Sequence, residues 1–305
     1  MTIAASRVRI PAPGVALVVA TVAVSFSAII IRYADDDPST IVWLRMGMAA
    51  VLLVPWVVRD VRRRVMPRGR TQISLVLVSG VLLAGHFLLW TASLQYTSIA
   101  ASVLLVSIHP IIVTPLGKRL LGERVSRQTL AAVVLALIGT AVTCAGDLHL
   151  DGRAFYGDLL AIGGAVCLAG YLLIGRGVRA DLGVAGYSAI VYAVVCVVAA
   201  ATAVAGGVAH LPSPRVALAC FGLAVICTIG GHTVYNWALR HVQVLLVSLS
   251  FLGEPPLAAL LALAFFGAVP SLATIGGGVL IIVGLALALI EPQAWTRTTQ
   301  IALNG

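Results

Sequence analysis

Two titratable side chains lie in the middle of long apolar stretches of this sequence. Glu254 lies within the apolar run 244–266, roughly 14 Å from its start at 1.5 Å per residue, and His109 lies within the run 99–116. An apolar environment disfavours the charged form of a carboxyl, so Glu254 could gain and lose a proton near neutral pH. The pattern predicts proton coupling or the binding of a substrate ammonium group. The alternatives are a structural carboxyl bonded to a neighbouring helix and an ordinary buried histidine.

A proline follows each of these two side chains. Pro110 and Pro255 each remove a helical hydrogen bond, which frees the carbonyl groups of Val106 and Phe251. Free carbonyls beside a helix break are useful ligands in a polar cavity inside a membrane. We therefore expect both carbonyls to be available near the two titratable groups, although such breaks are also ordinary features of helix packing.

A second set of polar and aromatic residues recurs at helical spacing. His86 and Trp90 share one helical face, and His232, Tyr235 and Asn236 follow the same pattern later in the chain. Aromatic walls with a few polar groups suit a small amphipathic or cationic solute, through stacking and cation–π contact. The competing interpretation is an aromatic belt at the membrane interface, which fits Trp90 less well because it lies well inside its apolar run.

Three further side chains are candidates for the same site. Arg45 lies inside an apolar run and could extend to the membrane surface, hold a substrate carboxylate with its planar fork, or pair with an acid. Tyr171 and Tyr192 are possible cavity hydroxyls. The sequence contains no Walker A motif, no HExxH and no serine in a nucleophile-elbow context, so we predict no enzyme, no metal and no cofactor.

The composition identifies the setting in which these residues act. Hydrophobic residues make up 60% of the 305 residues and charged residues 10%, and the mean hydropathy is +1.06. A soluble protein could not build its exterior from so few charged side chains. The net charge of +9 does not indicate nucleic-acid binding, because the basic residues lie between apolar runs. The chain is therefore predicted to be an all-α membrane protein.

Ten apolar runs approach or reach the length of about 20 residues that a transmembrane helix needs. They are 14–32, 41–58, 73–94, 99–116, 130–145, 156–175, 185–205, 216–239, 244–266 and 272–290. The segments between them are short, so we expect no soluble domain.

The basic residues predict how the chain is oriented in the membrane. With the N-terminus inside, sixteen of the twenty Lys and Arg residues fall in interior segments and two in exterior loops. Positively charged loops stay on the cytoplasmic side. We therefore expect both chain ends to be cytoplasmic.

The sequence repeats itself. A shift of 145 residues aligns the third to fifth runs with the eighth to tenth without a gap, and Gly and Pro dominate the matches, such as Gly85 with Gly230 and Pro110 with Pro255. Each half holds five runs, which is an odd number, so the second half must enter the membrane inverted. The predicted fold is ten transmembrane helices as two inverted five-helix repeats, 1–145 and 156–290, followed by a cytoplasmic tail, 291–305.

Several motifs give the chain a specific resemblance. They are the Ser25-Phe26-Ser27-Ala28 to Arg32 end of the first run, Trp43-Leu44-Arg45, Pro110 with Leu121-Gly122-Glu123-Arg124, and Leu252-Gly253-Glu254-Pro255. In this order and spacing they resemble the EamA family of the drug/metabolite transporter superfamily, over nearly the whole chain. The resemblance implies a bacterial inner-membrane carrier that exports amino acids, their derivatives or other small polar metabolites. It also implies a central cavity lined by the first, third, fourth, sixth, eighth and ninth helices. One departure is Ala268, which stands where the second copy often has a glutamate.

The predicted function is secondary transport. The repeat shift pairs Glu254 with His109 and Trp90 with Tyr235, which would place the candidates around a site at mid-membrane, as alternating access requires. The expected partners are a small-molecule solute, a proton that could be exchanged for it, and the lipid bilayer, with the carrier a monomer or homodimer. A membrane-embedded sensor or assembly partner that transports nothing is the alternative.

Overall fold

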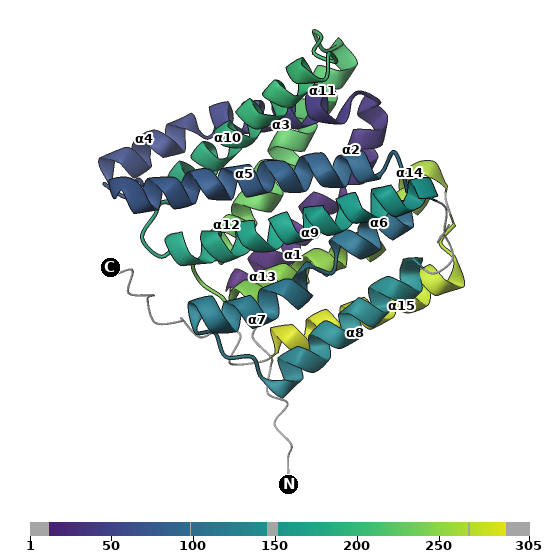
Figure 1. Ribbon diagram of the computed structural model, residues 1–305. Helices are drawn as coiled ribbons and strands as arrows, with labels where there is room; N and C mark the ends of the chain where they lie inside the picture. Colours follow the sequence, from purple (N-terminus) through teal and green to yellow (C-terminus); the bar gives the residue numbers. More distant parts are fainter. Residues whose placement is uncertain (1–11, 98, 145–151, 268, 291–305) are drawn as a thin grey trace.

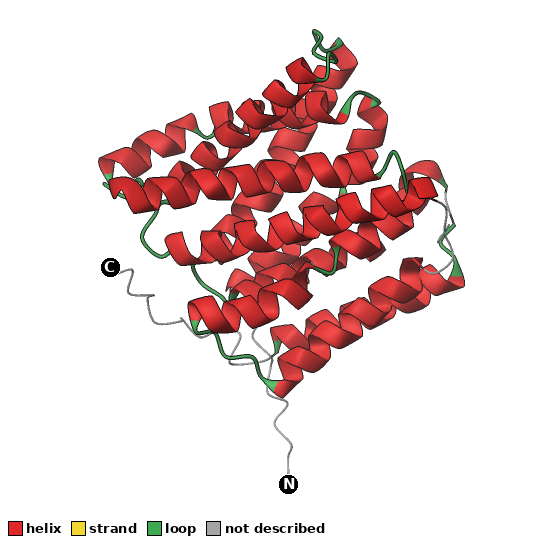
Figure 2. Ribbon diagram, viewed as in Figure 1, coloured by secondary structure: helices red, strands yellow, loops and turns green. Residues whose placement is uncertain are grey.

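The computed structural model describes residues 12–97, 99–144, 152–267 and 269–290. Every regular element in these ranges is a helix (Figure 2). The first half contains α1 (Ala12–Ser25), α2 (Ser27–Ala34), α3 (Pro38–Leu52), α4 (Val54–Arg62), α5 (Gly69–Ser93), α6 (Ile99–Val106), α7 (His109–Leu121) and α8 (Arg127–Cys144). The second contains α9 (Gly152–Val178), α10 (Val184–Ala205), α11 (Pro214–Gly222), the π-helix η2 (Leu223–Thr233), α12 (Val234–Ala238), α13 (Val244–Ser250), the 3₁₀ turn η3 (Phe251–Gly253), α14 (Glu254–Phe266) and α15 (Leu272–Leu289).

The helices account for the predicted apolar runs, with one difference in how many can cross a membrane. Within the described ranges, eight spans are long and apolar enough, and the pair α3 and α4, bent by 48°, would add a ninth. The run expected at 130–145 falls on α8, whose apolar part, Arg127–Thr143, is shorter than the others. The all-helical, multi-pass architecture is confirmed, and ten crossings remain a prediction.

Two of the spans are broken at their prolines. The span that begins with α6 is interrupted before His109 and Pro110, and the span that begins with α13 passes through η3 before Glu254 and Pro255. Proline has no N–H to donate and it disfavours helical geometry in the residue before it, so both breaks follow from the sequence. Each break puts a titratable residue at the first position of the next helix.

The helices pack in long, near-antiparallel pairs (Figure 1). α9 packs against α5, α6 and α7, while α1 packs against η2, α12 and α14, and α8 lies along α15. Glycines permit the closest approach. A Cβ atom added at Gly277 would lie 2.4 Å from the carbonyl oxygen of Gly139, so α8 and α15 touch backbone to backbone.

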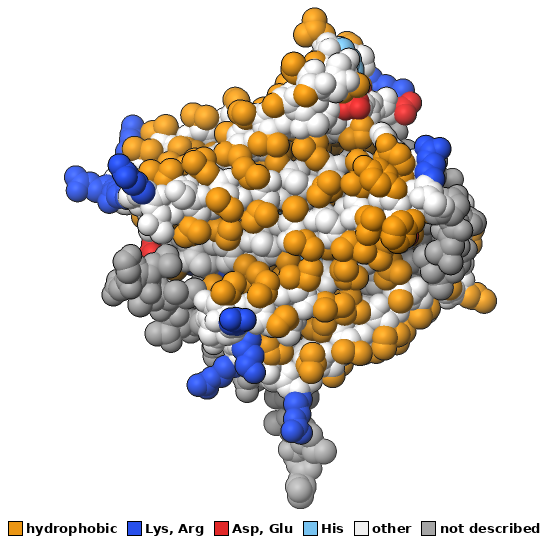
Figure 3. All heavy atoms as spheres, in the orientation of Figure 1, with side chains coloured by type: hydrophobic (Ala, Val, Ile, Leu, Met, Phe, Trp, Pro, Cys, Tyr) orange, Lys and Arg blue, Asp and Glu red, His pale blue; other side chains and the backbone are white. Residues whose placement is uncertain are grey.

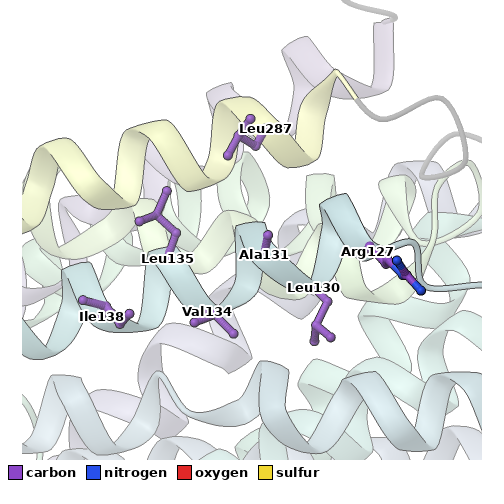
Figure 4. A pocket seen from close by; sticks show the side chains of 7 residues that line it. All are labelled: Arg127, Leu130, Ala131, Val134, Leu135, Ile138 and Leu287. Atoms are coloured by element: carbon purple, nitrogen blue, oxygen red, sulfur yellow. The ribbon is translucent and has the colours of Figure 1, made fainter.

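The exterior is apolar, as a lipid-facing surface must be. Apolar side chains cover the face shown in Figure 3, and Lys and Arg side chains gather near the ends of the helices. A groove of about 500 Å³ runs along this exterior beside α8 (Figure 4). It is lined by Arg127, Leu130, Ala131, Val134, Leu135, Ile138 and Leu287.

Candidate functional site

Arg45 is buried in the middle of the bundle. Its side chain comes from α3 and is 2% exposed, so it does not extend to the membrane surface. Its Nε donates to the hydroxyl of Thr228 at 2.7 Å, and its Cζ lies 4.8 Å from the ring centroid of Phe87. It forms no ion pair with any described acid, and its Nη2 has no hydrogen-bond partner among the described residues.

Aromatic rings connect the two halves of the chain around this arginine. Phe87 of α5 contacts His232 of η2 at 5.2 Å between ring centroids, and His232 contacts Phe251 of η3 at 5.8 Å. Phe251 in turn lies 4.1 Å from Tyr235 and 5.8 Å from His109. Segments far apart in sequence thus meet in one buried group of rings.

Glu254 is at the edge of this group. The residue as a whole is partly exposed, its carboxyl is buried, and its charge interacts with that of Arg45. Because the distance to Arg45 exceeds that of an ion pair, both groups keep capacity for a ligand. We call Arg45, His86, Phe87, Trp90, His109, Thr228, His232, Tyr235, Phe251 and Glu254 the central cluster.

His109, which the repeat pairs with Glu254, is 2% exposed and points inward. Its Nδ1 lies 3.0 Å from the carbonyl of Val106 and its Nε2 lies 3.2 Å from the carbonyl of Ser248. The expectation of free carbonyls at the two breaks is wrong. The carbonyl of Val106 is hydrogen-bonded to the ring of His109. The carbonyl of Phe251 accepts the backbone N–H of Glu254. Inside a membrane each backbone group needs a partner, and the nearest available donors supply it.

His86 and Trp90 stack on each other along α5. Their ring centroids are 6.2 Å apart with an interplanar angle of 3°, and His86 Nδ1 lies 3.1 Å from the carbonyl of Gly164. Trp90 is 8% exposed, so it does not belong to an interface belt. Its Nε1 is buried with no partner among the described residues.

The other three candidates are bonded to protein groups. The Tyr171 hydroxyl donates to the side-chain oxygen of Asn236, whose amide nitrogen donates to Ser188 at 3.0 Å. The hydroxyl of Tyr192 lies 3.0 Å from that of Thr233. These bonds tie α9 and α10 to η2 and α12. Tyr171, Asn236 and Tyr192 therefore hold the walls of the central cluster in position.

The sequence did not predict a set of polar contacts that joins helices at one end of the bundle. Glu123, just beyond α7, forms an ion pair with Arg176 of α9 at 3.0 Å, and its two carboxyl oxygens accept the N–H of Val244 at 3.0 and 3.1 Å. A carboxylate at a helix N-terminus stabilises the helix, here α13. Glu123 thus joins three helix ends.

Sequence reasoning also missed three members of the central cluster, Thr228, Phe87 and Phe251. A usable signal existed for one of them, since the 145-residue shift pairs Phe87 with His232. Three histidines lie in this region, yet the described residues contain no group of His, Cys, Asp and Glu placed to hold a metal ion.

Comparison with known proteins places this geometry in a family. The model of the EamA-like transporter family matches residues 13–145 and again 155–290. Two proteins of Archaeoglobus fulgidus, both described as uncharacterized transporters, are similar along their length. One is 24% identical over 90% of this chain and 96% of its own, and the other 25% identical over 86% and 91%.

A solved structure described only as a crystal structure of a protein has the same fold. It superposes with a TM-score of 0.75 at 20% identity, over 90% of this chain and 96% of its own. Because the family model covers both halves and the helices are long and apolar, the protein is a multi-pass membrane transporter. The chain belongs to the EamA-like transporter family.

Proposed function

We propose that the protein is a secondary transporter that exports a small polar metabolite, such as an amino acid or a derivative, by alternating access. The observation that carries the proposal is the position of Glu254. This buried carboxyl begins the second half of a broken span, and its charge interacts with that of Arg45 inside the bundle. Ionisable groups inside a membrane are costly and usually mark a transport path.

The two halves act as inverted repeats in this proposal, 1–145 and 156–290, with ten crossings and both termini cytoplasmic in a bacterial inner membrane. Two observations support the arrangement as two related halves. The family model matches each half separately. The packing is also reciprocal, because the first helix of each half lies against the third and fourth spans of the other. Such halves can rock around a site that both of them line.

Glu254 provides the coupling in this mechanism. When the site faces the cytoplasm, the carboxyl releases its proton and the solute binds; when the site faces outward, protonation returns and the solute leaves. Arg45 and the aromatic rings supply the remaining contacts, and His86, His109 and His232 complete the wall. Tyr171, Tyr192 and Asn236 act through the hydrogen bonds that hold the wall together.

The experiment uses the purified full chain in lipid vesicles loaded with the twenty amino acids, whose efflux is followed by mass spectrometry. We expect efflux of at least one solute, accelerated by an inwardly directed proton gradient. Glu254→Gln should abolish the acceleration. The matched control is Asp158→Asn, which removes a carboxylate of α9 that accepts a hydrogen bond from Thr97, and this variant should retain the acceleration. Unchanged pH dependence in Glu254→Gln contradicts the coupling role, and no efflux of any solute contradicts export of amino acids.

A further inference from the structure

The guanidinium of Arg45 has fewer hydrogen-bond acceptors among the described residues than it has donors. Thr228 accepts from Nε, and Nη2 is buried with no partner among the described residues. Burying a donor without a partner destabilises the fold, and more so for a charged group, so native proteins rarely retain one without reason. The planar fork of arginine matches the two oxygens of a carboxylate. The missing acceptor is therefore one that the solute can bring.

Thr228 is oriented by an unusual backbone. It lies in the π-helix η2, and its hydroxyl donates to the carbonyl of Leu223, five residues earlier, at 3.1 Å. A threonine hydroxyl has one proton, so this bond leaves its lone pairs for Arg45 Nε. Thr233 repeats the pattern with the carbonyl of Thr228 at 3.1 Å. In a regular α-helix the hydroxyl would instead bond to the carbonyl four residues back.

We propose that Arg45 binds a carboxylate group of the solute, and that Thr228, fixed by the π-helical register of Leu223–Thr233, is the positioning residue that aims it. The inference rests on the proposed transport function and narrows its substrate to carboxylates. π-helical segments often occur at functional sites, because the register change redirects side chains.

The surroundings define the rest of the ligand. Phe87 lies against the arginine, His232 packs on Phe87, and Phe251 continues the wall of rings. His232 Nδ1 and Trp90 Nε1 are also buried without partners among the described residues, and the indole can only donate. A wall of rings with unpaired donors fits a carboxylate that carries an apolar or aromatic tail.

The test is equilibrium binding to the purified full chain in lipid nanodiscs, with three carboxylates and their matched amines as probes. The pairs are isovalerate and isoamylamine, benzoate and benzylamine, and 3-phenylpropanoate and phenethylamine. We expect saturable binding of at least one carboxylate. Thr228→Val, nearly the same shape without the hydroxyl, should weaken it by about tenfold, the loss expected for one hydrogen bond to a charged group. Thr228→Ser should bind within about twofold of the wild type.

Two further variants keep the test decisive. Arg45→Lys retains the charge but loses the fork, and should also weaken carboxylate binding by about tenfold. Thr140→Val removes a buried hydroxyl that bonds only to Ala136 in α8, far along the chain from the cluster, and should change nothing. Any amine that binds should keep its affinity in Thr228→Val.

The proposal is overturned if the wild type binds none of the carboxylates, if Thr228→Val binds them as tightly as the wild type, or if Thr140→Val weakens them equally. It is distinguishable from the transport proposal. Carboxylate binding without flux in vesicles contradicts transport and leaves the carboxylate site standing. Flux of amines alone contradicts the carboxylate site and leaves transport standing.

Discussion

Helix α5 and the span formed by α11, η2 and α12 align residue for residue, yet their backbones differ. The 145-residue shift superimposes Gly69–Ser93 on Pro214–Ala238. The first is one unbroken α-helix, whereas the second passes through a π-helix over Leu223–Thr233. Both contribute rings to the central cluster, and Phe87 of one touches its counterpart His232 in the other.

The difference follows from two polar residues. Where the second span has Thr228 and Thr233, α5 has Leu83 and Leu88. Both threonine hydroxyls bond to carbonyls five residues earlier, which stabilises the wider turn, and leucine offers no such bond. A repeated sequence can therefore keep its packing partners while one copy changes register. The second copy thereby gives Arg45 the hydroxyl of Thr228 as an acceptor, whereas its counterpart Leu83 in the first copy has no hydroxyl.

The largest predicted difference between the two spans is the loss of stability when a glycine is replaced by alanine. In α5 a Cβ atom at Gly80 would lie 2.6 Å from the Val194 Cβ, and one at Gly85 would lie 3.0 Å from the Cys167 sulfur. At Gly230, the counterpart of Gly85, the nearest atom would be 3.5 Å away. We expect Gly80→Ala to lower the free energy of unfolding by about 1–3 kcal/mol, the usual cost of overpacking.

The three Gly→Ala variants should differ in how much they change the free energy of unfolding. Gly85→Ala should cost less than Gly80→Ala, because a sulfur can shift more easily than a Cβ atom, and Gly230→Ala should be neutral or stabilise by up to about 1 kcal/mol through helix propensity. Thermal unfolding in one detergent measures all three. Equal destabilisation at Gly80 and Gly230 would contradict this difference in packing between the two positions.

The smallest effect concerns the segments that lead into the two spans. Ahead of α5, the carbonyl of Val65 accepts the N–H of Gly183 at 2.8 Å, a contact that does not titrate. At the matching position ahead of α11, His210 bonds to the carbonyl of Val208 and to Asp36, and these contacts raise the pKa of its imidazole. Protonation of His210 therefore stabilises the folded conformation of the segment ahead of α11.

The sign of the pH dependence follows from that shift. The contact is at full strength below the ordinary histidine pKa of about 6.5 and is lost as the pH rises through the raised value. Hydrogen-exchange protection of residues 206–213 should fall slightly over this range, while that of 61–68 should not. Asp36→Asn should flatten the response. A response that persists in Asp36→Asn would assign it to another group.

The sequence predicted the helical runs and the breaks at Pro110 and Pro255, because apolar length and proline are local signals, but not the bend between α3 and α4. The 145-residue shift also paired Glu254 with His109, whereas the sequence left open whether Arg45 extends to the membrane surface or turns inward. The π-helix could not be predicted, since a helix that is apolar on nearly all sides has no polar face from which to read 3.6 residues per turn against a wider period. The carbonyls at the breaks were misjudged because their partners depend on side-chain conformation and tertiary contacts.

The central claim is that the cluster lies on a solute path open in turn to both sides of the membrane. Ser248, whose buried hydroxyl has no partner among the described residues and whose carbonyl faces His109, is the place to test it. We would replace the five native cysteines, introduce Ser248→Cys, and apply a membrane-impermeant thiol reagent to vesicles of each orientation. We predict that Ser248→Cys is labelled from both sides. Ile282→Cys should not be labelled, because Ile282 is 60% exposed on the lipid-facing exterior. Labelling of Ser248→Cys from neither side would contradict it.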